Sequence, residues 1–152
     1  MTGFDLQTEN VARLIQLALG PVFLVSGVGI TLNMLTQRLA RIVDRARTLE
    51  DRREAATDEG HRAHIDEDLR FIVRRTRYIN SAIALSTTSG LLTALVVTLL
   101  FASEFTRISS VGAIIAVMFV AATACLAIAF LMFLVEVRIA TKSLRIGGKI
   151  RR

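Results

Sequence analysis

Few residues in this sequence have the type and spacing that metal or redox chemistry requires. His61 and His64 are the two histidines, and their i, i+3 spacing can place both on one face of a helix. Asp58 and Glu59 lie nearby, but no third strong ligand is spaced to complete a metal site. Cys125 is the single cysteine and lies in an apolar run, where a thiol is expected to be inert. We therefore predict no metal site and no cofactor.

The motifs of the common enzyme classes are also missing from the sequence. It contains no G-x-S-x-G, no P-loop, no H-E-x-x-H and no G-x-G-x-x-G. The segment Gly27-Val28-Gly29 lies inside a charge-free apolar run, so it is not a phosphate-binding loop. We therefore do not expect the protein to be an enzyme.

The residues that could bind a charged ligand in this sequence are clustered arginines. Two clusters of three stand out, which are Arg38, Arg41 and Arg45 in the first, and Arg74, Arg75 and Arg77 in the second. The first cluster has i, i+3, i+7 spacing, which places it on one helical stripe. We expect both clusters to contact anionic phospholipid; the alternative is an anion-attracting ring at the mouth of a pore. Asp44, inside the first cluster, is expected to pair with Arg41 or Arg47.

The two arginine clusters lie between the first and second of three charge-free apolar runs, and the helices that these runs form determine where the arginines lie. The three runs cover residues 14–35, 79–102 and 111–135, and each is at least 22 residues long. A helix of about 20 residues crosses the hydrocarbon core of a bilayer. The 152-residue chain is 53% hydrophobic and 21% charged, with a mean hydropathy of +0.53, so disorder is excluded. We predict an all-α integral membrane protein with three transmembrane helices.

The basic residues predict the orientation of these helices. Seventeen of the 19 Lys and Arg residues lie in segments 36–78 and 136–152. By the positive-inside rule, we expect segment 36–78 and the basic tail 136–152 to face the cytoplasm. The short segment 1–13 and the link 103–110 would then lie outside. The positive-inside rule thus accounts for seventeen of the 19 basic residues, so we expect no nucleic-acid partner.

Segment 36–78 has the apolar spacing of an antiparallel helical hairpin. A narrow, mostly apolar seam with 4, 3, 4, 3 spacing lies on each arm. It consists of Leu35, Leu39, Ile42, Ala46 and Leu49 on the first arm, and of Ile65, Leu69, Ile72, Thr76 and Ile79 on the second. Residues 57–60 read as the turn, and Thr57 or Asp58 can cap the second helix. We expect the first helix to run unbroken to about residue 56 and the second to start at about residue 61. Two seams this short are marginal alone, which favours support from other copies in a homo-oligomer.

The first two apolar runs also carry polar and small residues. These are Pro21, Ser26, Gly27, Gly29 and Asn33 in the first run, and Ser86, Thr87, Ser89 and Gly90 in the second. Polar groups in hydrocarbon seek partners, so these residues predict tight helix packing. The alternative is a water-filled pore that these two helices line. Pro21 is expected to kink the first helix.

One stretch of the chain resembles a known family. The matching residues are Gln16-Leu17-Ala18-Leu19, Pro21-Val22-Phe23-Leu24, Leu32-Asn33 and the run from Arg38 to Arg45. They are similar to an uncharacterised bacterial three-span membrane-protein family, domain of unknown function 2721, and the likeness covers nearly the whole chain. The resemblance implies a bacterial inner-membrane protein. It brings no assigned activity, catalytic residue or cofactor.

Two functional classes fit these observations. The first is a homo-oligomeric structural or regulatory membrane protein that assembles through its hairpin and its transmembrane helices. The second is a homo-oligomeric ion channel whose pore is lined by the first two transmembrane helices. One copy has too few spans to enclose much of a pathway, so both classes favour an oligomer.

Overall fold

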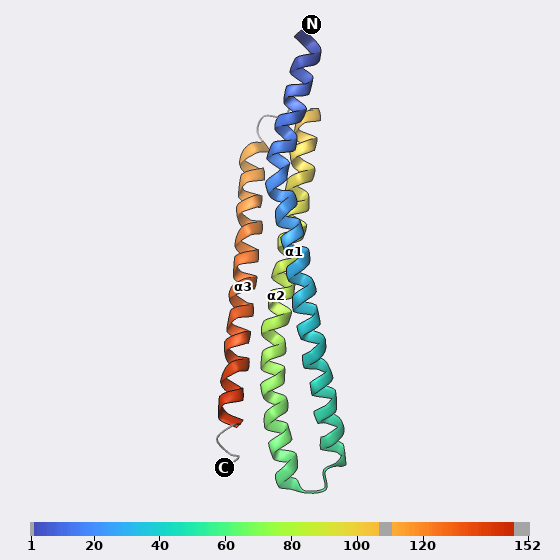
Figure 1. Ribbon diagram of the computed structural model, residues 1–152, viewed down its shortest axis with the longest axis vertical. Coiled ribbons are helices and arrows are strands. Elements are labelled where there is room, and N and C mark those ends of the chain that lie inside the picture. The colour runs from blue at the N-terminus through green and yellow to red at the C-terminus, as the bar shows by residue number, and fades with distance from the viewer. Residues whose placement is uncertain (1, 107–110, 148–152) are drawn as a thin grey trace. The chain divides into compact units, whose positions relative to one another are not determined.

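The computed structural model describes residues 2–106 and 111–147, with side chains for residues 12–13, 15–103 and 111–140. The described chain forms three α-helices, α1 (Thr2–Ala55), α2 (Glu59–Thr106) and α3 (Gly112–Gly147) (Figure 1). All three are long and apolar enough to cross a membrane. The predicted all-α class and the three apolar helices are confirmed, and their composition indicates a membrane location.

An aspartate caps the start of α2 at the break between α1 and α2. Residues 56–58 separate the helices, and the Asp58 carboxylate accepts a hydrogen bond from the backbone N–H of His61 at 3.1 Å. This bond satisfies one of the N–H groups that a helix start leaves without a partner. The break is shorter than the predicted turn at residues 57–60, because Gly60 already lies in the first turn of α2. Helix α1 ends close to the predicted residue 56.

Helix α1 continues through Pro21, which is buried. Proline has no N–H, so the carbonyl of Leu17, one turn earlier, has no helical donor from residue 21. The kink that the sequence predicts at this residue stays a prediction.

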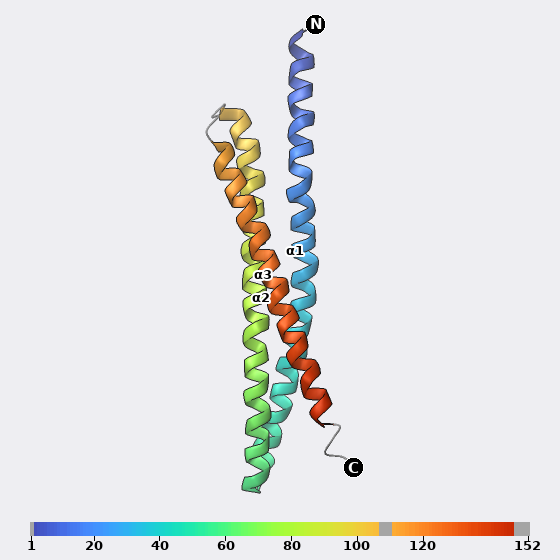
Figure 2. The ribbon, with the colours of Figure 1, turned by 90° about the vertical axis from the view of Figure 1, so that its left-hand side faces the viewer.

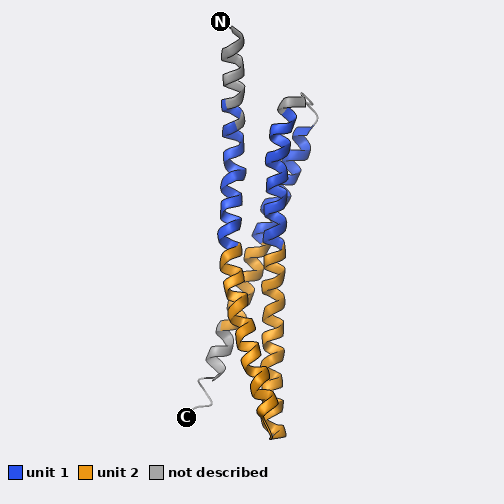
Figure 3. Cartoon of the chain, turned by 90° about the vertical axis from the view of Figure 1, so that its right-hand side faces the viewer, with its two compact units in different colours: residues 1–31, 85–127 blue, residues 32–84, 128–152 orange. Residues whose placement is uncertain are grey.

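The chain divides into two compact units, coloured in Figure 3. Unit 1 contains residues 1–31 and 85–127, and unit 2 contains residues 32–84 and 128–152. Each unit therefore holds a part of all three helices.

In unit 2, the core is an aliphatic cluster between α1 and α2, which lie side by side there (Figure 2). Ile42, Ile72 and Ile79 are buried. Four partly buried side chains pack against them, namely Leu39, Ala46, Leu49 and Ile83. The two arms of the hairpin thus bury their apolar seams against each other within one copy.

In unit 1, α1 and α2 approach closely at a glycine. A Cβ built on Gly90 would lie 3.2 Å from Cγ1 of Val28, closer than ordinary van der Waals contact. Val96 of α2 and Ala122 of α3 are almost fully buried in the same unit. The absence of a side chain at Gly90 therefore allows α1 and α2 to pack closely.

Large apolar side chains cover the outer faces of the helices. Examples are Phe23, Ile30, Leu91, Val117 and Val120, each more than 60% exposed. Apolar patches of this extent are unusual on soluble proteins and normal on a surface that faces lipid.

Candidate functional site: a buried glutamate between two arginines

A buried carboxylate on α3 joins the three helices of unit 2. Glu136 is fully buried and accepts hydrogen bonds from two arginines. Arg38 of α1 donates from Nη1 to Oε2 at 2.7 Å. Arg75 of α2 donates from Nη2 and Nε to Oε1 at 2.6 and 3.1 Å. One side chain therefore connects α1, α2 and α3.

Each of these three side chains lies next to an end of one apolar run, and the ends meet in unit 2. Arg38 lies just after the first run, Arg75 just before the second, and Glu136 directly after the third. The ring of Phe133, one turn before Glu136, lies beneath the Arg38 guanidinium with 5.0 Å between Cζ and the ring centroid. A cation over an aromatic face at this distance is attracted to it. Two residues of α3 thus fix the position of Arg38.

The cost of burying Glu136 explains why two arginines meet it. A carboxylate removed from water loses several kcal/mol of solvation, which only excellent ion-pair geometry offsets. Three charge-assisted hydrogen bonds at short distances provide that geometry.

A pocket of about 240 Å³ opens beside this ion pair. It is lined by Arg38, Arg41, Ile42, Arg45, Ile72, Arg75 and Glu136, all in unit 2. Four arginines against one glutamate leave a formal charge of +3 around it. The pocket is therefore strongly basic, and it is named the basic pocket below.

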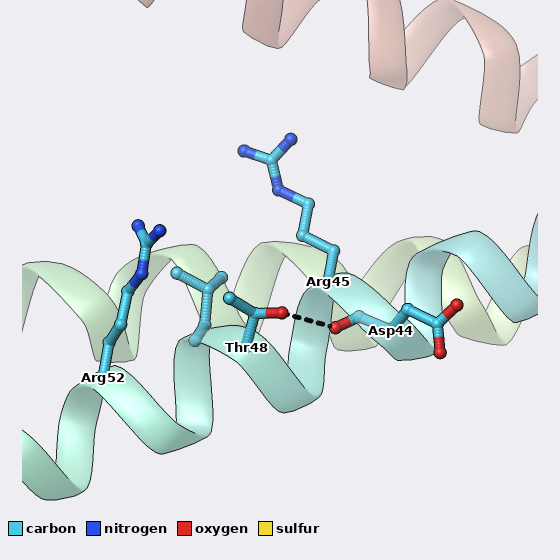
Figure 4. A pocket seen from close by; sticks show the side chains of 5 residues that line it. Asp44, Arg45, Thr48 and Arg52 are labelled. Carbon is cyan, nitrogen blue, oxygen red and sulfur yellow. Dashed lines mark hydrogen bonds between the residues drawn. The ribbon is translucent and has the colours of Figure 1, made fainter.

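Two arginines of the basic pocket have no acidic partner among the described residues. Arg41 and Arg45 are exposed, and neither forms an ion pair within the part of the chain that the structure describes. The predicted pairing of Asp44 with Arg41 or Arg47 is wrong for the described residues, where Asp44 forms no ion pair. Its side chain leaves α1 in a different direction from that of Arg45 (Figure 4).

Residues that line a second, more open pocket along α1 are drawn in Figure 4. Its volume is about 390 Å³. Arg45 and Arg52 extend to the same side of the helix there, and the Thr48 hydroxyl donates to the backbone carbonyl of Asp44 at 3.0 Å. The lining residues of this pocket come from α1 alone. Basic charge therefore continues along α1 beyond the basic pocket.

The structure gathers four of the six predicted arginines. Arg38, Arg41, Arg45 and Arg75 line the basic pocket, whereas Arg74 and Arg77 are exposed on α2 and do not line it. The difference follows from helix geometry, because neighbouring positions in a helix point about 100° apart.

The hairpin seam residues lie between the arms of unit 2. Leu39, Ile42, Leu49 and Ile72 belong to the aliphatic cluster. Ile65 is buried nearer the tip, and Leu69 is half-buried.

The small and polar residues predicted on the first span lie largely on open surface. Ser26 is exposed and donates to the carbonyl of Val22 at 3.2 Å, while Asn33 is exposed and accepts from Gln37 at 3.0 Å. A Cβ built on Gly27 or Gly29 would meet nothing within 4 Å. Among the described residues of one copy, therefore, neither glycine lies at a close contact between helices.

The polar residues of the second span divide between inside and outside. Ser86 and Ser89 are fully buried, and their hydroxyls have no hydrogen-bond partner within the described structure. Thr93, also buried, donates to the carbonyl of Ser89 at 2.7 Å. Thr87 is exposed. Ser86, Ser89 and Gly90 thus lie in the packed interior of unit 1.

An exposed ion pair lies near the tip of the hairpin. Arg53 Nε donates to the Asp66 carboxylate at 2.5 Å, and this contact raises the pKa of Arg53. His61 and His64 are exposed on α2. Among the described residues, no three His, Cys, Asp or Glu side chains gather as a metal site would require.

Sequence reasoning missed Glu136. The available signal was its position, since it is the one acidic residue that directly borders an apolar run. Parts of the three predicted terminal and linking segments fall outside the described residues. These parts are most side chains of segment 1–13, the link side chains after residue 103 with residues 107–110 as a whole, and the tail side chains after residue 140 with residues 148–152 as a whole.

Comparison with known proteins gives one match. A family model described as a protein of unknown function, DUF2721, matches residues 18–146. No curated protein and no solved structure matches the chain.

Proposed function

Because the chain belongs to the DUF2721 family, whose activity is unknown, we propose from its own geometry that it is a homo-oligomeric membrane protein of structural or regulatory type. The observation that carries the proposal is the set of contacts that Glu136 makes. The fully buried carboxylate accepts hydrogen bonds from two arginines and so links three helices within unit 2. Such an arrangement suits a scaffold better than a catalyst.

The homo-oligomeric part of the proposal is supported by the open small-residue surface of α1 in unit 1. Ser26 and Gly29 are exposed, and a side chain added at Gly29 would meet nothing. Helices in membranes associate through small residues that let backbones approach. Since no neighbouring helix in the described part of the same copy lies against Gly29, a helix of a second copy is the partner that we propose.

The test is the Gly29→Leu variant. Leucine is a good helix former, and the space around Gly29 is open, so the fold of one copy should be unchanged. We expect the wild-type protein to have the mass of several copies in detergent, measured by light scattering after size exclusion, and the variant to shift toward one copy. Gly112→Leu is the matched control, because a Cβ at Gly112 also meets nothing within 4 Å. A single-copy wild type, or an unchanged mass for Gly29→Leu, would reject the proposal.

The proposal includes a bacterial inner-membrane location, with the N-terminus outside and the C-terminus in the cytoplasm. It rests on the seventeen basic residues in segments 36–78 and 136–152. In a Cys125→Ala background, Thr2→Cys should react with an impermeant maleimide on intact spheroplasts, and Thr57→Cys only after lysis. The reverse labelling pattern would contradict this orientation.

A channel is the second proposal, supported by polar side chains on exposed helix surface. Asn33 and Thr87 both lie within apolar runs and are exposed in a single copy. In an oligomer, such positions can line a lumen. Purified protein in liposomes should then conduct ions, and Asn33→Leu or Thr87→Leu should change the conductance. Absence of ion flux across lipid composition and pH would reject this role.

A further inference from the structure

The basic pocket offers more hydrogen-bond donors than its own carboxylate uses. Each arginine has five N–H groups. Arg38 donates one of them to Glu136 and Arg75 donates two, so most N–H groups of both guanidinium groups form no hydrogen bond with the described residues. Arg41 and Arg45 line the same pocket without an ion pair among the described residues.

The charge and shape of the pocket suit a phosphate group. Planar guanidinium groups bind phosphate oxygens with paired hydrogen bonds, and several converging arginines are the usual protein site for such an anion. Glu136 keeps Arg38 and Arg75 in place, which reduces the side-chain entropy that binding would otherwise cost. The volume of about 240 Å³ leaves room for more than one phosphate oxygen to approach the arginines.

The position of the pocket indicates where the phosphate comes from. Arg38, Arg75 and Glu136 each lie within four residues of the end of an apolar run. The pocket is therefore at the level at which a bilayer changes from hydrocarbon to headgroups. Basic pockets between transmembrane helices at this level bind the headgroups of anionic lipids. Ile42 and Ile72 add an apolar part to the lining.

We propose that the basic pocket binds the phosphate of an anionic phospholipid headgroup, through Arg41 and Arg45 together with the Glu136-positioned Arg38 and Arg75. The inference does not depend on the oligomer or on the proposed function. It also separates the predicted arginines into two groups, because Arg74 and Arg77 lie outside the pocket.

The experiment measures the melting temperature of the full-length protein in a neutral detergent. The additives are phosphatidylglycerol, phosphatidylcholine with the same acyl chains, and inorganic phosphate at matched ionic strength. Wild-type protein should be stabilised by phosphatidylglycerol and not by phosphatidylcholine. Inorganic phosphate should stabilise only at much higher concentration, since it brings no acyl chains.

The decisive variants are two pairs that remove equal charge. Arg41→Gln with Arg45→Gln should raise the phosphatidylglycerol concentration at half-maximal stabilisation by about 30-fold, the factor expected for the loss of two arginine contacts. Arg74→Gln with Arg77→Gln should leave that concentration close to the wild-type value. Phosphatidylglycerol retained through purification, counted by mass spectrometry, gives a second readout that does not depend on melting.

Three results would overturn the inference. Equal shifts for both pairs would mean that general positive charge attracts the lipid. Stabilisation by inorganic phosphate at the concentrations effective for phosphatidylglycerol would mean that the pocket takes a soluble anion. No stabilisation by phosphatidylglycerol would mean that the pocket binds neither.

Discussion

Replacement of Glu136 by glutamine tests the buried ion pair without changing the size of the side chain. Glutamine keeps one carbonyl oxygen as an acceptor, but it loses the negative charge and places an NH₂ group against an arginine. An N–H group of Arg38 or Arg75 then faces the glutamine NH₂, and both groups are donors. The two guanidinium charges also lose their partner in the middle of unit 2.

The magnitude follows from the burial of the three groups. Removing one partner of a fully buried ion pair costs about 3–5 kcal/mol. The Glu136 side chain is completely buried, but those of Arg38 and Arg75 are 31% and 20% exposed, so water recovers part of their solvation. We therefore expect Glu136→Gln to lower the free energy of unfolding by about 2–3 kcal/mol.

The assay is reversible unfolding in mixed micelles, in which dodecyl sulfate is titrated into a neutral detergent and helix loss is followed by circular dichroism. Glu67→Gln is the matched control, because Glu67 is exposed on the same hairpin and its change should have almost no effect. Equal unfolding free energies for Glu136→Gln and Glu67→Gln would refute the account of the buried carboxylate.

Three further predictions concern the two units separately. Ile72→Ala should lower the unfolding free energy by about 2–4 kcal/mol, because Ile72 is buried in the aliphatic cluster, whereas Val73→Ala, at 60% exposure, should cost much less. Asp58→Ala should cost about 1 kcal/mol through loss of the cap on α2, and Asp58→Asn should restore most of it, both measured in the same titration. Ser86→Ala and Ser89→Ala should each leave the melting temperature unchanged or raise it, since both buried hydroxyls lack a hydrogen-bond partner among the described residues. A clear fall in melting temperature would show that they bind a group.

The sequence predicts those features whose cause lies within one segment. The length of a charge-free run is enough to identify a membrane-crossing helix, and all three runs form helices. Spacing of 4, 3, 4, 3 is also a local signal, and Ile42 and Ile72 accordingly share one cluster.

Contacts between distant segments were harder to predict. Glu136 meets arginines 98 and 61 residues away in the sequence, and which residues meet depends on how the helices rotate and slide against each other. Asp44 was expected to pair with a near neighbour because distance along the chain was the available guide. In the described structure Asp44 forms no ion pair, so nearness along the chain was a poor guide.

The glycines show the same limit. A small residue signals that a close approach is possible, but it does not say which helix approaches. Gly90 meets Val28 within unit 1, whereas the space beside Gly27 and Gly29 is open. Sequence alone placed these three residues in one class, and the packing of a single copy separates them.

The most direct test of the proposed assembly is an experimental structure of the wild-type protein in lipid nanodiscs, determined by cryo-electron microscopy. The account predicts several copies around a symmetry axis, with Ser26 and Gly29 of α1 in a dry contact between neighbouring copies. A single copy in the nanodisc would contradict the assembly. A water-filled axis lined by α1 and α2 would contradict the structural role and support the channel.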